Sequence, residues 1–238
     1  VSSSSASVTT AKAAVDATGS VVTPVAFPLT TSVESKTLGA GNDTFDSNNS
    51  TASQTLNAGD VLDGLGGTDR LNIVSSIVGG TLGTGVQTKS VEQLSVNAVG
   101  ATTVDASLMA GVTDVYNTSS LNAVTVTGLT KIANVHVVNT NANITATFAA
   151  DAIAGVSDAT TVLLNGAATT VSNTVTVDGI ETINLVAAGT ASGSATSTAT
   201  VTSNALTTLN ITGVSAVVSA GLPGATATVT GTVTSDDG

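Results

Sequence analysis

Carboxylate side chains gather in one short stretch of this sequence. The chain has 238 residues, with 16 acidic and 5 basic side chains. Asp43, Asp46, Asp60, Asp63 and Asp69 lie close together in a region that contains a single cation, an arginine at position 70. Because the chain has no cysteine, a bound metal would be held by oxygen rather than by thiolate. Such oxygen ligands favour Ca²⁺, which takes about six to eight of them.

Glycines precede two of these aspartates in a regular pattern. Positions 38–46 (LGAGNDTFD) and 64–72 (GLGGTDRLN) both match a Gly-Gly-x-Gly-x-Asp-x-apolar-x nonapeptide, each with leucine replacing one of the first two glycines. Glycine permits a tight turn with inward carbonyls, and aspartate adds an anionic oxygen. The pattern predicts calcium-binding turns formed by Gly39, Gly41, Asp43, Asp46, Asp60, Asp63, Gly64, Gly66 and Asp69. The alternative is that these are plain Gly/Asp turns without metal.

Catalytic residue patterns are missing from the sequence. The only histidine, His136, lies between two valines, an alternation that predicts an outward-facing, solvated side chain. Glu92, Asp114 and Glu181 are widely spaced, and we expect each of them to end a strand in solvent. No Gly-x-Ser-x-Gly, His-Glu-x-x-His or phosphate-binding glycine loop occurs. The sequence therefore predicts a protein that is not an enzyme.

Composition restricts the partners and the core. The net charge of −11 argues against nucleic acid and against an anionic membrane surface, since both require clustered cations. No apolar run is long enough to cross a bilayer, so we expect no membrane insertion. With three Phe, one Tyr and no Trp, the core must be built from Val, Ile, Leu and Ala.

Apolar residues recur with a period of 20 or 21 residues. The pair Leu94 and Val96 is followed by Val115 and then by Val135 and Val137. A second set repeats in the same way, with Val124 and Val126 matched by Ile144 and Ala146, and similar units return near positions 180–185 and 206–211. Such a period with β-branched alternation predicts an all-β parallel β-solenoid, of the β-helix or β-roll kind. An antiparallel β-sandwich is the alternative.

Asparagine and threonine are placed regularly on these repeats. Asparagines at 97, 117, 139, 141, 165, 184 and 210 lie near the ends of the apolar runs, where they would cap turns or form ladders across coils. The segments 125–127 (TVT) and 145–147 (TAT) lie 20 residues apart and could stack into a hydroxyl ladder like that of ice-binding solenoids. The simpler explanation is that threonine favours exposed strand positions.

Three segments differ in composition. Residues 1–37 are rich in Ser, Thr and Ala, with a short helix expected at 11–16, and we interpret them as a linker or the end of a preceding domain. Residues 38–77 form the Gly/Asp calcium-binding segment, and residues 78–238 form the Thr/Val/Asn-rich solenoid. Because the chain begins without Met or a signal-like segment, we expect it to be a piece of a longer polypeptide.

The segments 37–45 and 56–73 resemble the opening part of RTX-related surface proteins secreted by Gram-negative bacteria, especially surface-layer proteins of the Caulobacter type. Segments 91–94 and 180–185 are similar to the solenoid coils of those proteins. The resemblance implies type I secretion, calcium-dependent folding outside the cell, and assembly with copies of itself into a lattice on lipopolysaccharide or another surface glycan. The chain departs from the family by lacking long nonapeptide arrays and a C-terminal secretion signal.

These observations predict a structural, self-assembling component of an extracellular surface layer that is stabilised by Ca²⁺. An adhesin or ligand-binding region of a large type I-secreted protein is the alternative. An ice-binding threonine solenoid is the third hypothesis.

Overall fold

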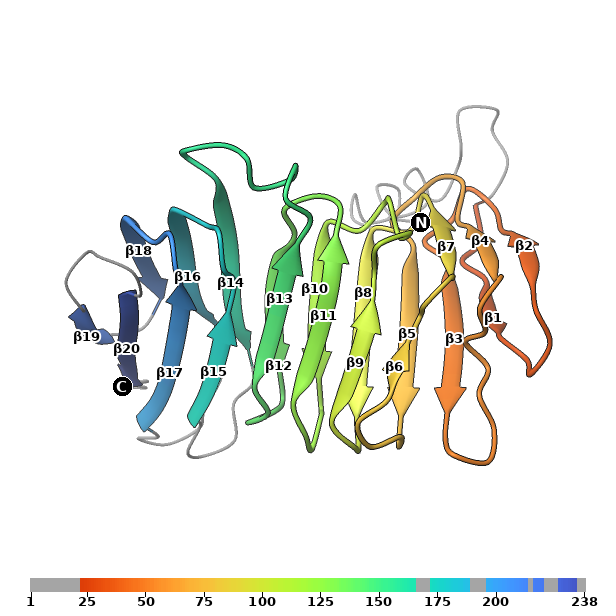
Figure 1. Ribbon diagram of the computed structural model, residues 1–238, viewed down its shortest axis with the longest axis horizontal. Coiled ribbons are helices and arrows are strands. Elements are labelled where there is room, and N and C mark those ends of the chain that lie inside the picture. The colour runs from red at the N-terminus through yellow and green to blue at the C-terminus, as the bar shows by residue number, and fades with distance from the viewer. Residues whose placement is uncertain (1–21, 166–171, 189–195, 214–215, 221–226, 235–238) are drawn as a thin grey trace, which may run out of the picture.

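The chain folds into an elongated stack of β-strand coils (Figure 1). The structure is a computed structural model that describes residues 22–165, 172–188, 196–213, 216–220 and 227–234. Every regular element within these ranges is a strand. The short helix expected at 11–16 lies outside the described residues.

A nine-stranded parallel sheet extends along the molecule. Its strands in spatial order are β1 (Ala26–Pro28), β3 (Thr44–Asn49), β5 (Arg70–Ser75), β8 (Gln93–Ala98), β10 (Asp114–Thr118), β12 (Asn134–Val138), β14 (Ala159–Asn165), β16 (Thr182–Ala188) and β18 (Thr208–Gly213). Strands adjacent in this sheet are not consecutive in the chain. Each coil therefore leaves the sheet and returns one position further along.

The strands that lie in the chain between successive strands of this sheet belong to two further sheets. The eight-stranded sheet has the order β19 (Ala216–Ala220), β20 (Ala227–Thr234), β17 (Thr196–Ser203), β15 (Ser172–Thr176), β13 (Ile144–Phe148), β11 (Val124–Leu129), β9 (Thr102–Asp105) and β6 (Thr81–Leu82). The three-stranded sheet has the order β2 (Ser35–Thr37), β4 (Val61–Asp63) and β7 (Gln87–Lys89). The first coils thus alternate between the nine- and three-stranded sheets, and the later coils alternate between the nine- and eight-stranded sheets. The coil from β5 to β8 passes through all three sheets, with β6 in the eight-stranded and β7 in the three-stranded sheet.

The predicted parallel β-solenoid is confirmed. All pairs in the nine-stranded sheet are parallel, which rules out the antiparallel sandwich. Antiparallel pairing is found where β20 joins β17 and β19, at the C-terminal end of the stack. The segment at 22–37 contributes β1 and β2 to the same sheets.

The core is a stack of small aliphatic side chains, as composition predicts. Matched positions in successive coils carry Leu94, Val115, Val135, Val162 and Leu185, all at most 1% exposed. Phe45 and Met109 are larger members of the buried set. Because each coil alone cannot bury its apolar face, stacking is what stabilises the strands.

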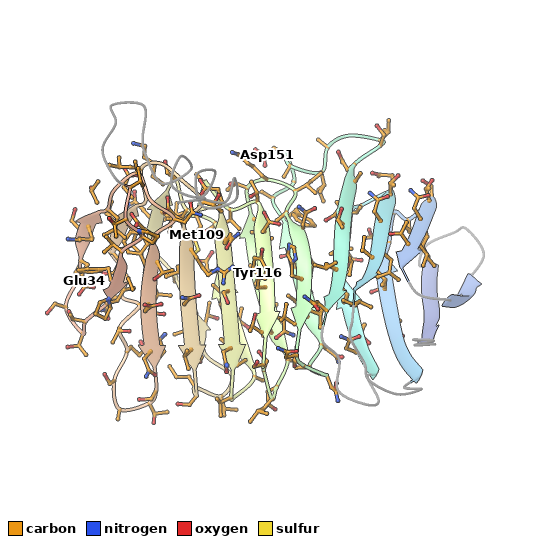
Figure 2. All side chains as sticks on the ribbon, turned by 180° about the vertical axis from the view of Figure 1, so that it is seen from behind. Glu34, Met109, Tyr116 and Asp151 are labelled. Atoms are coloured by element: carbon orange, nitrogen blue, oxygen red, sulfur yellow. The ribbon has the colours of Figure 1, made fainter. Side chains whose placement is uncertain are left out.

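The coil length varies along the stack. Residues that are hydrogen-bonded across adjacent coils are 26 positions apart at Asp43 and Asp69, and 20 apart at Asp114 and Asn134. The number of residues between bonded positions of adjacent coils rises again to 27 after the loop between β13 and β14. That loop contains Asp151 (Figure 2). That loop is why the 20-residue pattern of the sequence is lost after the third repeat.

Candidate metal-binding turns

The two Gly/Asp turns lie in successive coils, and their carboxylates bind backbone amides across the coil boundary. Asp43 Oδ1 accepts a hydrogen bond from Val25 N at 2.7 Å, and its Oδ2 accepts one from Gly39 N at 2.8 Å. One coil later, Asp69 Oδ1 accepts from Asp43 N at 2.7 Å. Both aspartates are at most 1% exposed. Each carboxylate therefore links its coil to the preceding one.

Glutamates continue the same arrangement. Glu92 Oε2 accepts from Asp69 N at 2.9 Å, and Glu181 Oε2 accepts from Asp158 N at 2.9 Å. The expectation that these glutamates end strands in solvent is wrong. Each precedes a strand and is only partly exposed, because its carboxylate satisfies an amide of the preceding coil.

One oxygen of Asp69 is unsatisfied. Asp69 Oδ2 is buried and has no hydrogen-bond partner. Burial raises the pKa of Asp69 to about 6. The hydrogen bond from the amide of Asp43 lowers this pKa, whereas the negative charges of Glu92, Asp43 and Asp63 also raise it. A buried carboxylate surrounded by like charges is stabilised by either a proton or a cation.

Gly64 packs directly against this oxygen. A Cβ at position 64 would lie 2.3 Å from Asp69 Oδ2 and 2.2 Å from the carbonyl oxygen of Ser90. Because glycine has no side chain, the carboxylate oxygen of Asp69 and the carbonyl oxygen of Ser90 can both lie close to position 64. Both are hard oxygen donors of the type that Ca²⁺ binds, and they are two of the about six to eight that the ion takes.

The other predicted aspartates lie apart from this corner. Asp60 accepts hydrogen bonds from Glu34 N and Asn57 N, both at 2.8 Å, and burial raises the pKa of Asp60. Glu34 marks its position at the end of the solenoid (Figure 2). Asp46 Oδ1 accepts from Asn72 Nδ2 at 2.7 Å on the outer side of the nine-stranded sheet. These two aspartates are engaged in separate contacts.

Asp63, at the end of β4, has two partners of its own. Its Oδ1 accepts from Leu65 N at 3.0 Å, and its Oδ2 binds Lys89 Nζ at 3.2 Å. The backbone bond from Leu65 is the main reason that the pKa of Asp63 is lowered. Asp63 nevertheless adds negative potential at Asp69.

The predicted glycines have different roles. A Cβ at Gly41 would lie 2.9 Å from Thr23 O, so that glycine allows a close backbone approach. Gly39 and Gly66 have no atom closer than 3.7 Å to the position of such a Cβ. Leu65, which replaces a consensus glycine, has a positive φ of 64° and is strained.

The structure thus brings together Asp43, Asp69 and Gly64, with Asp63 nearby, and leaves Asp46 and Asp60 elsewhere. Within the described ranges, no group of three acidic, histidine or cysteine side chains is arranged to hold a metal. Sequence reasoning missed Glu92 and Ser90. Glu92 could have been found from its position, because it follows Asp69 by 23 residues, which is close to the length of one coil.

His136 belongs to a packed cluster on the outer side of the nine-stranded sheet. Its ring stacks on Tyr116 with centroids 4.2 Å apart, and its Nε2 lies 2.8 Å from Asp114 Oδ1. Arg70 lies over the Tyr116 ring at 4.8 Å. Tyr116 lies near the middle of the sheet (Figure 2). The side chain of His136 faces outward, but with 15% exposure it is sheltered rather than solvated.

Comparisons of the chain with protein-family models, curated proteins and solved structures find no match. The fold itself defines the class, which is a parallel β-solenoid. In the part of the chain that the structure describes, no helix is long and apolar enough to cross a membrane.

Proposed function

We propose that this chain is a structural component of an extracellular surface layer that assembles with copies of itself, in contact with lipopolysaccharide or another surface glycan. The observation that carries the proposal is the continuous parallel pairing from β1 to β18. Backbone hydrogen bonds along the whole stack give a stiff rod, as a lattice-forming subunit requires. The net charge of −11 keeps such subunits soluble before they assemble.

We also propose that Ca²⁺ stabilises the N-terminal coils at the corner formed by Asp69, Gly64 and Ser90. Support comes from the unpartnered Asp69 Oδ2 beside the Ser90 carbonyl and from the surrounding negative charge. Neutralising that charge would favour the folded chain. Binding to the folded form alone would stabilise it by about 2.7 kcal/mol at a hundredfold excess over Kd.

The proposal assigns no catalytic role to the chain. His136, which is its single histidine, is held between Tyr116 and Asp114 on an outer sheet face.

Electron microscopy of the source cells tests the surface-layer function. Antibody to the chain, coupled to gold, should label a periodic layer on intact cells. Chelation of Ca²⁺ should release both the layer and the label. Label confined to the cell interior, or spread over a surface without periodic order, would refute the proposal.

A further inference from the structure

The outer face of the eight-stranded sheet carries a continuous column of threonines. Register places one threonine of each strand directly beside the next, through Thr81 of β6, Thr103 of β9, Thr125 of β11, Thr145 of β13, Thr176 of β15 and Thr202 of β17. We call this column and its flanking threonines the threonine face. The strands β9 to β17 run side by side along the solenoid (Figure 1).

The side chains of this column point outward in a fixed orientation. Their strand neighbours Val104, Val126 and Val175 are fully buried, so the alternating threonines must face away from the core. From β9 to β17 these threonines are half-buried. The hydroxyl of Thr202 donates to the hydroxyl of Thr176 at 3.0 Å, which aligns these two side chains.

Flanking threonines widen the column into a grid. Thr127 and Thr147 lie two residues beyond the column on β11 and β13, and Thr174 and Thr200 pair with each other two residues before it on β15 and β17. Parallel pairing spaces neighbouring strands by about 4.8 Å, and alternate residues along a strand by about 6.6 Å. The face therefore presents hydroxyl and methyl groups at two fixed repeats.

The threonine column carries no charge in a chain of net charge −11, and one carboxylate, that of Asp105 on β9, stands beside Thr127 in the flanking row. The acidic residues at its margin have local partners. Asp105 Oδ1 accepts from Ser107 N at 3.0 Å, and Asp178 Oδ1 accepts from Asn204 N at 3.1 Å. An uncharged column favours a neutral partner, and the fixed spacing favours one that is itself periodic.

We propose that the threonine face binds the surface of an ice crystal. Ice is neutral and periodic, and its oxygen atoms can exchange hydrogen bonds with a row of hydroxyl groups while methyl groups fill the gaps between them. Side chains already held by the sheet lose little conformational entropy on binding. This function is independent of the calcium corner and of surface-layer assembly.

Two other occupants fit the face less well. A second copy of the chain would meet rows of half-buried threonines that offer no large apolar side chain to bury. A neutral polysaccharide would find no aromatic platform, because Phe27, Phe45 and Tyr116 belong to the nine-stranded sheet and Phe148 packs against the core.

Partition of the protein into slowly growing ice tests the proposal. The wild-type chain should be enriched in the ice fraction, and Thr145→Tyr, which places a bulky side chain in the middle of the column, should lose that enrichment. Thr118→Tyr is the matched control, since Thr118 is a half-buried outer residue of β10 on the opposite sheet. It should partition like the wild type. Circular dichroism verifies that each variant is folded, and Thr103→Lys replaces Thr145→Tyr if the latter does not fold.

Exclusion of the wild-type chain from ice would overturn the proposal. Equal loss of enrichment in the column variant and in Thr118→Tyr would also overturn it. A dimer in sedimentation that Thr145→Tyr dissociates, with no enrichment in ice, would identify a second copy as the occupant. Co-sedimentation of the wild-type chain with cellulose, again without enrichment in ice, would identify a neutral polysaccharide.

Discussion

The N-terminal coils, residues 22–92, and the later coils, residues 93–213, join neighbouring coils with different side chains. In the first region the links are carboxylates, as at Asp43 and Asp69. In the second region hydroxyls are common. Ser120 Oγ accepts from Ala98 N at 2.9 Å, and Ser203 Oγ accepts from Ile180 N at 3.1 Å.

The difference is one of degree, because Glu181 is a carboxylate link in the second region and Asp158 Oδ2 is buried there without a partner. A hydroxyl both accepts and donates, and Ser203 Oγ uses both capacities because it also donates to Ile180 O at 2.7 Å. An ionised carboxylate only accepts. Its second oxygen needs another donor or a positive charge, and Asp69 Oδ2 has no such partner.

The largest expected effect is that of Gly64→Ala. The added methyl group would overlap Asp69 Oδ2 and Ser90 O, so the free energy of unfolding should fall by about 3 kcal/mol or the N-terminal coils should fail to form. Gly66→Ala is the control, because the nearest atoms to its Cβ would lie at 3.8 Å. Denaturant unfolding measures both variants, and equal losses would contradict the close packing at Gly64.

Asp69→Asn should stabilise the chain in the presence of a chelator. The pKa of about 6 lies above that of an unfolded aspartate, so the ionised group weakens the fold at pH 7, and this cost disappears as the pH falls from 6 to below 4. We expect a gain of about 1–3 kcal/mol at pH 7 and none at pH 3. Thermal melts at both pH values, with and without Ca²⁺, measure it. Calcium should stabilise the wild type but not the variant.

Asp43→Asn is the matched control and should have the opposite sign. Asp43 uses both oxygens as acceptors, from Val25 N and Gly39 N, so the amide variant leaves one backbone donor unpaired. We expect a loss of about 1–3 kcal/mol. If both amide variants stabilise the chain, the assignment of satisfied and unsatisfied oxygens is wrong.

Leu65→Gly should stabilise the N-terminal coils by about 1 kcal/mol. Leu65 is 51% exposed and has a positive φ of 64°, so glycine relieves strain at little cost in buried area. Leu65→Ala keeps the strain and should give no gain. Chemical denaturation compares the two variants, and equal stability would show that the turn is unstrained.

The smallest effect is expected in the later coils, at Asp114. Burial raises the pKa of Asp114, but hydrogen bonds from His136, Thr113 and Asn134 outweigh it, so the pKa is lowered. A lowered pKa contributes stability above pH 4 that is lost as the pH falls through the folded value. Asp114→Asn should therefore cost at most about 1 kcal/mol at pH 7 and less at pH 2.5, as measured by urea unfolding. If Asp114→Asn changed the free energy of unfolding equally at both pH values, the charge of Asp114 would be unimportant.

The fold could be predicted because the core repeats. The sequence matched Val124 with Ile144 and Val126 with Ala146, and the structure pairs these residues. The asparagine ladder was predictable in part, since Asn210 Nδ2 donates to Asn184 Oδ1 at 2.9 Å. The grouping of the aspartates was not predictable from their proximity in sequence, because residues within one coil can lie on different sides of the solenoid.

The sequence by itself determined the parallel coils, the aliphatic core and the threonine-rich strand faces, since each follows from local alternation and composition. Only the tertiary structure decided which carboxylate oxygen lacks a partner and which threonines align. Thr145 and Thr176 are neighbours although they lie 31 residues apart, while Thr125 and Thr145 are only 20 apart. Register is set by the pairing of buried residues such as Ile144 with Val175, and loops of unequal length between coils hide it from the sequence.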